Sequence, residues 1–400
     1  MTSPADRPFA DCGPLLVVVS ALMLVDTALF TALIPLLPHY VHTLGLSKSE
    51  AGVLVAAYPL GTLAGALPGG MLASRMGVRT CMLVGLALMS VAILVFGFAH
   101  GAPVLDAARF AQGVGGACAA AGGLAWLAAA TPTSNRGAAL GVALGSAVGG
   151  ALLGPIIGAL ASRVGIGPVF AASSGIGVCL MAAALLLRPA PTTEPQRLRR
   201  VLPALSDPGV AAGMWLTCLA GLAFGVVDLL SPLRLSSLGA GADVIAAAFL
   251  GAAALEAVLS PAVGRIADRR GRLVPVRVSL AVGVVVAVFI PVIEPSGALV
   301  ALLVVGLPAF GTLVVPAAAM VSAGADRLGV HQGLGFGLVN LALGVGQGVA
   351  ALSSGAIAQA TNEVVPFALL ALAFAGTLGL LTPPGRRLLQ RSGLFVHSLD

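Results

Sequence analysis

Four ionisable residues, Asp26, Arg109, Asp228 and Glu256, interrupt long apolar stretches of this sequence. A charged group at bilayer depth costs roughly 2.5 to 3.5 kcal/mol on insertion scales, so a chain that carries one turns it toward a cavity or a partner. A carboxylate in such a place binds either a cation or a proton, and competition between the two is the simplest chemistry of exchange. These residues are the first candidates for substrate binding and proton coupling.

Asp26 lies near the middle of the first apolar stretch, residues 15–38. This stretch is long enough to cross a bilayer, which takes about 20 helical residues. We expect Asp26 to exchange a proton for a cation, because an acid inside a membrane is a functional hypothesis by default. The alternative is a structural hydrogen bond to a facing hydroxyl or backbone carbonyl.

Each of the other three charges allows two interpretations, of which we prefer the functional one. Asp228 is either a second cation or proton site or an interfacial acid solvated by water. Glu256, in the middle of its stretch, is either a proton relay or half of a buried pair. Arg109 follows Asp106 by one helical turn, so it either forms a local ion pair or faces a cavity and acts on a carboxylate there.

Aromatic residues near these charges offer cation–π contacts to an amine. The candidates for lining a cavity are Phe30, Tyr58, Trp126, Trp215 and Phe224. Taken one at a time, packing or a lipid-facing position explains each of them better.

The sequence contains no motif for other chemistry. The five histidines lie in loops or at the ends of apolar stretches, and the five cysteines lack metal-ligand spacing. There is no phosphate-binding G-x-x-x-x-G-K-[ST] loop and no nucleophile elbow. We therefore expect no metal, no cofactor beyond protons as the coupling ion, and no enzymatic activity.

The composition predicts an all-α polytopic membrane protein. Hydrophobic residues make up 58% of the 400-residue chain and charged residues 9%, whereas globular proteins carry about 25% charged residues. Apolar stretches predict twelve transmembrane helices. Their ranges are 14–38, 50–71, 80–99, 103–130, 138–161, 168–187, 210–233, 244–264, 276–293, 297–321, 333–359 and 364–383.

The 21 basic residues predict the orientation in the membrane. With the N-terminus inside, the inner segments hold 17 arginines and the outer ones only Lys48, Arg163 and Arg234. We expect a multi-pass protein of the cell (inner) membrane with both termini cytoplasmic. The net charge of +6 then reflects topology rather than nucleic-acid binding. The expected partners are the lipid bilayer and a small molecule, with the chain working as a monomer.

A Pro- and Arg-rich segment divides the chain into two halves. The predicted domains are an N-terminal six-helix bundle (1–187), a cytoplasmic linker (188–208), a C-terminal six-helix bundle (209–384) and a cytoplasmic tail (385–400). A repeated loop, G-x-[LI]-A-[SD]-R-x-G, supports this division. The first copy contains Gly70, Arg75, Gly77 and Arg79, and the second contains Gly264, Asp268, Arg269, Gly271 and Arg272. Duplicated halves around a midplane site are a transporter architecture.

The two loops resemble the loop motif of the major facilitator superfamily and, within it, of the twelve-span drug:proton antiporters. In that family the motif's aspartate pairs with helix ends and basic residues to latch the outward-open state. The second copy has this aspartate at Asp268, whereas the first has Ser74. The resemblance therefore implies a latch in the C-terminal half and leaves the N-terminal one in doubt.

Two further segments carry the resemblance. Residues 105–113 are similar to the family's L-x-x-x-R-x-x-Q-G pattern, whose buried arginine, here Arg109, is implicated in proton coupling. Residues 141–158 resemble the antiporter signature G-x8-G-x3-G-P-x2-G-G, which marks exporters, although Ala159 replaces its last glycine. The spacing of Gly150, Gly154 and Gly158 predicts one smooth helix face. We also expect a kink at Pro155, so that this helix seals one side where the two halves meet.

The first span also resembles that of vesicular amine transporters and their bacterial relatives, in which the aspartate, here Asp26, meets the cationic amine. Asp228, four residues before Pro232, is similar to a carboxylate in their seventh span. Asn340 stands where they carry another aspartate, and the tenth span has no acid. The amine-specific part of the resemblance is therefore partial.

We interpret the chain as a proton-coupled secondary active transporter that exports hydrophobic or cationic small molecules, of multidrug or amine type, by alternating access. One alternative is a proton-coupled transporter of a neutral or anionic metabolite, with Arg109 as the anion contact. More remote alternatives are a non-transporting membrane sensor and a lipid-modifying enzyme. A sensor needs a soluble output domain and an enzyme needs clustered His, Asp or Cys, and the sequence offers neither.

Overall fold

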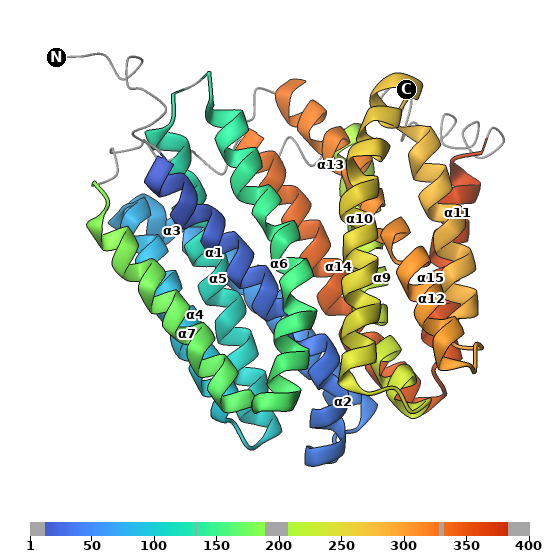
Figure 1. Cartoon of the computed structure of the whole chain (residues 1–400). Coiled ribbons are helices and arrows are strands. Elements are labelled where there is room, and N and C mark those ends of the chain that lie inside the picture. Colours follow the sequence, from blue (N-terminus) through green and yellow to red (C-terminus); the bar gives the residue numbers. More distant parts are fainter. Residues whose placement is uncertain (1–12, 133, 189–206, 328–331, 383–400) are drawn as a thin grey trace. The chain divides into compact units, whose positions relative to one another are not determined.

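The computed structural model describes residues 13–132, 134–188, 207–327 and 332–382 (Figure 1). Every regular element in these ranges is a helix, as the composition predicts. The N-terminal half contains α1 (Gly13–Thr31), α2 (Leu33–Leu44), α3 (Lys48–Met76), α4 (Val78–Phe98), α5 (Ala102–Ala130), α6 (Arg136–Val164) and α7 (Ile166–Leu186). The C-terminal half contains α9 (Pro208–Ser237), α10 (Ala242–Arg270), α11 (Leu273–Phe289), α12 (Ser296–Gly306), α13 (Pro308–Arg327), α14 (Gln332–Ala360) and α15 (Val364–Leu380).

Each of the twelve predicted spans contains a described helix. Among the described residues, nine helical segments are long and apolar enough to cross a membrane, and α3 qualifies as a bent pair, Lys48–Ala66 with Pro68–Met76. The two remaining spans correspond to α11 and α15, which are apolar but shorter, at 17 residues each. The helices are therefore consistent with a twelve-span protein.

The chain packs as two compact units. The first comprises Met1–Leu46 and Ala57–Gln196, and the second comprises Ser47–Ala56 and Arg197–Asp400. The predicted N-terminal bundle, 1–187, includes the first residues of α3, which the contacts group with the second unit. Apart from residues 188, 207 and 208, the predicted linker lies outside the described residues, as does the whole predicted tail.

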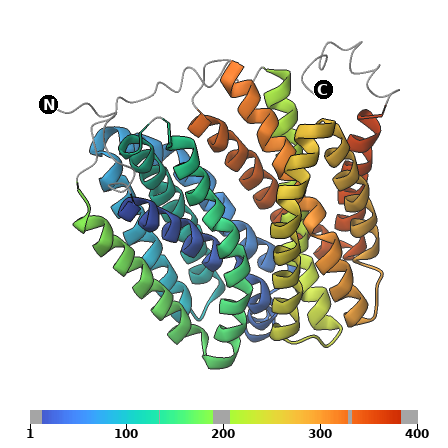
Figure 2. The ribbon, with the colours of Figure 1, turned by 45° about the horizontal axis from the view of Figure 1, so that its top comes forward.

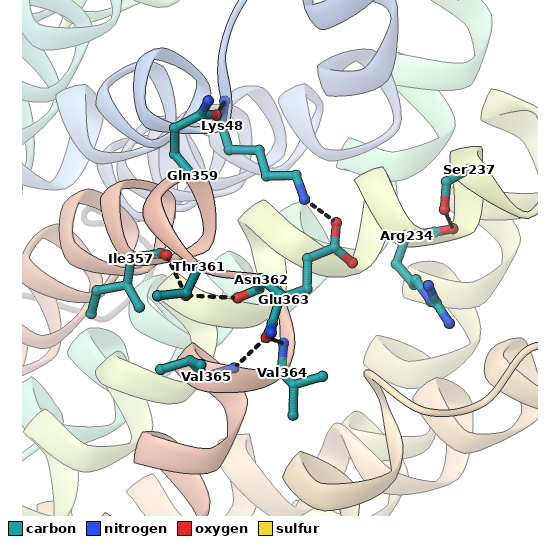
Figure 3. Close-up of polar contacts among 10 residues, drawn as sticks. All are labelled: Lys48, Arg234, Ser237, Ile357, Gln359, Thr361, Asn362, Glu363, Val364 and Val365. Carbon is teal, nitrogen blue, oxygen red and sulfur yellow. Dashed lines mark hydrogen bonds and ion pairs between the residues drawn. The ribbon is translucent and has the colours of Figure 1, made fainter.

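Polar contacts at the start of α3 account for this grouping. The ammonium group of Lys48 lies 2.7 Å from Oε1 of Glu363 (Figure 3). The backbone N–H of Lys48 donates to Oε1 of Gln359 at 3.1 Å. A Cβ atom at Gly52 would come within 2.6 Å of the carbonyl oxygen of Ala351. The first turns of α3 therefore pack backbone to backbone on α14.

Glycines in the left-handed region recur at matching places in the two halves. Gly77 and Gly271, which follow the same helix of the repeated loop, have φ values of 90° and 83°. Gly45 and Gly239, which precede that helix in each half, have φ values of 64° and 85°. Side chains other than glycine rarely adopt such angles, so these four positions fix where the chain turns.

In each half, one arginine donates to a backbone carbonyl at the C-terminal end of the last helix. Arg79, at the start of α4, donates to the carbonyl of Leu185 near the end of α7. Arg277, near the start of α11, donates to the carbonyl of Leu381 just after α15. A helix C-terminus carries unsatisfied carbonyls and a partial negative charge, so a guanidinium group there is favourable.

Two spans are broken where prolines remove backbone donors. α1 ends at Thr31 and α2 starts at Leu33, and Pro35 has no N–H for the carbonyl of Thr31 four residues earlier. α12 and α13 are separated at Leu307, directly before Pro308. By contrast, α6 is a single helix that runs through Pro155.

The glycine face of α6 packs against α1 and α2 within the first unit, and α1 and α6 lie side by side in both ribbon views (Figures 1 and 2). A Cβ atom at Gly154 would overlap the hydroxyl of Thr31, and one at Gly158 would overlap the carbonyl of Ala32. Gly150 faces α1 in the same way. We predicted from the sequence that this face lies where the two halves meet, whereas these contacts hold the Asp26 helix inside its own unit.

Replacement of Gly154 by alanine should destabilise the protein by about 1 to 3 kcal/mol, because the added methyl group meets the backbone and hydroxyl of α1. Gly145 of the same helix has nothing within 4 Å of a Cβ position, so Gly145→Ala is the matched control and should be neutral or slightly stabilising. Unfolding of the purified variants in detergent tests this. Equal stabilities for the two variants would contradict the packing of α6 on α1.

Candidate functional site

The carboxylate of Asp26 lies inside the first unit between three helices. The hydroxyl of Tyr58 on α3 donates to its Oδ2 at 2.8 Å. Oδ1 is shielded from solvent and accepts no hydrogen bond from the described residues. A Cβ atom at Gly116 on α5 would lie 2.6 Å from Oδ1, so only a glycine leaves room for the carboxylate there. One oxygen of Asp26 thus accepts a hydrogen bond, and the other has no hydrogen-bond partner among the described residues.

Arg109 of α5 is bound to the end of α1. Its side chain is 1% exposed and donates to the carbonyls of Leu29 and Phe30, each at 3.1 Å, and to Oε1 of Gln112 at 2.9 Å. These carbonyls belong to the last turn before the break at Ala32, where intrahelical donors run out. Arg109 therefore stabilises the broken end of the helix that carries Asp26.

Aromatic rings surround the guanidinium group of Arg109. Phe30 and Tyr58 are stacked with centroids 4.7 Å apart. The guanidinium carbon lies 5.7 Å from the centroid of Phe30, 5.3 Å from that of Tyr58 and 5.8 Å from that of Phe96. These are cation–π distances. Two of the aromatic residues proposed to meet an amine therefore already contact a cation of the chain itself.

Glycines bring α3 and α5 close enough to assemble this cluster. A Cβ atom at Gly113 would overlap the carbonyl of Tyr58, and one at Gly61 would overlap the carbonyl of Phe110. Backbone contact of this kind needs small residues on both helices. The contact places the Tyr58 hydroxyl on Asp26 and explains why the Q-G pair follows Arg109.

The second unit contains a buried acid, Asp228, and a half-buried one, Glu256. Asp228 on α9 is 9% exposed, and no hydrogen bond joins its carboxylate to another described residue. Glu256 on α10 extends its carboxylate onto Gly311 of α13, where a Cβ atom would overlap it. Arg234, two residues after Pro232, donates to the carbonyl of Ile293 at 3.4 Å.

Other candidates lie apart from both groups. Trp126 is buried and stacks under Arg79, with 5.9 Å between the guanidinium carbon and the ring centroid. Trp215 is 48% exposed and donates to Thr377 at 3.2 Å. Phe224 is half-buried on α9, and Asn340 is exposed on α14. They are not brought to Asp26 or Asp228 by any described contact.

The repeated-loop residues lie mostly at the surface of their units. Arg75, Asp268, Arg269 and Gly70 are exposed, and Asp268 forms no ion pair with a described residue. The latch implied by the family resemblance therefore stays a prediction. The part of the chain that the structure describes also contains no group of three side chains that would hold a metal ion.

Sequence reasoning did not single out Gly116, Phe96 or Gly311 as parts of these groups. The run Gly113 to Gly116 directly after the arginine motif was a signal that a close neighbour lies there, but its identity required the structure. Gln112 was part of the quoted motif, and the structure assigns its oxygen to Arg109.

The sequence model of one protein family, described as Major Facilitator Superfamily, matches residues 19–331. The chain belongs to this superfamily. As a superfamily member it is an integral multi-pass membrane protein that transports a small molecule, and it is a transporter rather than an enzyme. The sequence interpretation of fold and general class is confirmed.

Solved structures of superfamily transporters share the fold of this member. A bacterial homologue of the human lysosomal transporter Spinster, in an inward-facing and unoccupied conformation, has a TM-score of 0.75 and 13% identity over 98% of this chain and 99% of the other. A D-xylose–proton symporter has a TM-score of 0.74 and 14% identity over 94% and 98% of the two chains. Identities this low establish the fold alone.

Curated relatives match this superfamily member over shorter segments. The quinolone resistance protein NorA of Staphylococcus aureus is 38% identical over 81 residues, which are 20% of this chain and 21% of NorA. A probable vesicular acetylcholine transporter of Danio rerio is 35% identical over 136 residues, 32% of this chain and 28% of the relative. The matched segments span between about a fifth and a third of each protein.

The chain has only two tyrosines, which makes a matched test of the Asp26 contact. Tyr58→Phe removes the donor from a shielded carboxylate oxygen and should cost about 1 to 3 kcal/mol of stability. The hydroxyl of Tyr40 is buried without a partner among the described residues, so Tyr40→Phe should cost nothing or stabilise. Denaturation of the two purified variants measures both effects. A larger loss for Tyr40→Phe would refute this arrangement of the cluster.

Proposed function

We propose that this transporter exports hydrophobic or cationic small molecules in exchange for protons, by alternating access. The observation that carries the proposal is the carboxylate of Asp26 in a membrane-spanning helix, which accepts a hydrogen bond from Tyr58 on one oxygen and has no hydrogen-bond partner among the described residues on the other. Such a group can hold either a proton or a cation, and the two compete for one oxygen.

The partial relatives support the substrate class. One is a quinolone resistance protein and the other a probable acetylcholine transporter, so both names point to organic molecules, and the second to a quaternary amine. Phe30 and Tyr58 form a stacked aromatic pair, and the Tyr58 hydroxyl donates to Asp26. An arriving cation would share these rings with Arg109, which favours hydrophobic, weakly hydrated cations over compact ones.

An anion contact at Arg109, the alternative substrate class, is less well supported. Two of its three nitrogens donate to Leu29, Phe30 and Gln112, and the third, Nε, is shielded from solvent. A guanidinium group bound in this way has no accessible donor for a substrate carboxylate or phosphate. We therefore assign Arg109 to positioning of the helix that carries Asp26.

The cellular setting is part of the proposal. The excess of arginines in alternate loops supports cytoplasmic termini in a cell membrane. With this orientation, the substrate enters from the cytoplasm or the inner leaflet and leaves when a proton from outside occupies Asp26. All the residues of the Asp26 cluster come from one chain, so no second copy of the protein is needed to form it. This supports function as a monomer.

Asp26→Asn tests the proton coupling. Asparagine keeps an oxygen for the Tyr58 hydroxyl but cannot take up a proton, so the fold should survive while coupling is lost. In proteoliposomes with a pH difference of one unit, each coupled proton sustains about a tenfold ratio of substrate across the membrane. We expect Asp26→Asn to lower the accumulation of tetraphenylphosphonium at least about tenfold, with substrate exchange at equal pH retained.

Glu294→Gln is the control, because Glu294 is an exposed carboxylate in the loop between α11 and α12. Accumulation by Asp26→Asn at the wild-type level would refute coupling at Asp26. Movement of a sugar or an organic acid by the wild type, with no movement of organic cations or dyes, would refute the substrate class.

A further inference from the structure

In each unit a carboxylate packs against a glycine, and the two glycines belong to helices at corresponding places in the two halves. In the first unit Asp26 lies on Gly116 of α5, which forms the fourth predicted span. In the second unit Glu256 lies on Gly311 of α13, which belongs to the tenth. Both acids come from a neighbouring helix, α1 in one unit and α10 in the other.

The two glycines are equivalent positions of the internal repeat. The separation of Gly116 and Gly311 along the chain equals, to within one residue, that of Gly77 and Gly271 in the repeated loops. The loop glycines share the same left-handed backbone conformation. The same sequence position therefore accommodates a carboxylate in both halves.

The side chain of Glu256 points into the second unit rather than away from it. Val258, two residues on, is 73% exposed and marks the outer face of α10. The carboxylate instead reaches the first turn of α13, directly after the break at Leu307. A negative charge is favourable near the N-terminus of a helix, because the helix dipole gives that end a partial positive charge.

No cation of the neighbouring helices neutralises Glu256. α10 packs against α9, α11, α12 and α13. Among these, α12 contains no titratable residue, and Arg327, in the last turn of α13, binds Asp207. The arginines of α11 and α9, Arg277 and Arg234, donate to backbone carbonyls.

The other titratable groups on and around α10 are acids, a thiol and the arginines in the last turns of α10. α9 adds Cys218 and Asp228, and α10 itself has Asp243 in its first turn and Arg265, Asp268, Arg269 and Arg270 in its last turns. None of the described residues donates a hydrogen bond to the carboxylate of Glu256. It is an acid at membrane depth without a structural partner.

We propose that Glu256 is a second proton-binding site, located in the C-terminal unit, so that two protons enter for each substrate exported. This inference rests on the proposed proton-coupled export. In each cycle the carboxylate of Glu256 takes one proton from the outer solution and releases it to the cytoplasm, and only an O–H bond forms and breaks. Asp26 takes the other proton, in competition with the substrate.

The number of coupled protons is measured from the substrate ratio at which net flux stops. Proteoliposomes are loaded with tetraphenylphosphonium, the membrane potential is clamped at zero, and a pH difference of one unit is imposed. Two coupled protons sustain a ratio of about 100-fold and one proton about 10-fold. We expect about 100-fold for the wild type, about 10-fold for Glu256→Gln, and no accumulation for Glu256→Gln combined with Asp26→Asn.

Glycine variants test the position of the carboxylate. Gly311→Ala should push Glu256 aside and lower the ratio to that of Glu256→Gln, with no further loss when the two changes are combined. Gly376 of α15 has nothing within 4 Å of a Cβ position, so Gly376→Ala is the matched control and should keep the wild-type ratio. A wild-type ratio for Glu256→Gln would overturn the proposal and leave coupling at Asp26 intact.

A second measurement works without any substrate. Infrared difference spectra of the reconstituted protein, recorded against pH, detect the C=O band of each protonated carboxyl group in the membrane. Glu256→Gln should remove one titrating band and Asp26→Asn another, while Glu294→Gln leaves both unchanged. Loss of no band in Glu256→Gln refutes the second site even if the wild type transports none of the probes.

Discussion

The structure depends on one constraint, which is that a charge within a membrane must be satisfied by the protein. Arg109 shows how this is met, since it donates to two backbone carbonyls in the last turn of α1, next to the break in the first span. Asp26 accepts a hydrogen bond from Tyr58, and Gly116, which has no side chain, leaves room for its carboxylate. The glycines at these contacts let helix backbones approach closely, and so they determine which charges meet.

The sequence was sufficient to predict the class of protein and the repeat, and the described helices are consistent with the twelve spans it predicts. Each of these is recorded in composition or in spacing along the chain. The importance of Asp26 also followed from the sequence, because a carboxylate amid leucine and alanine is costly unless it faces something. The partners of Arg109 did not follow, because a backbone carbonyl has no signature in the side-chain sequence. Similarly, glycine spacing predicts that a helix face is smooth but does not identify the helix that packs on it.

Asp26 and Arg109, which have opposite charges, both contact Tyr58. Because Phe30 and Tyr58 already contact a guanidinium group, they do not form an empty cage for an amine. This arrangement suits a role for Asp26 in which it gains and loses a proton in each cycle better than a role as a binding site for a cation alone. A hydrophobic substrate would then gain most of its affinity from apolar contact and only part from charge.

The two tryptophans of the chain fall one in each unit, and their surroundings differ. Trp126 is buried beside Arg79, and Trp215 is half exposed and bound to Thr377. Their emission should therefore respond to different events, one to the electric field of a nearby guanidinium group and the other to lipid or solvent. Removing either indole leaves an intrinsic fluorophore that reports on a single half of the transporter without any added label.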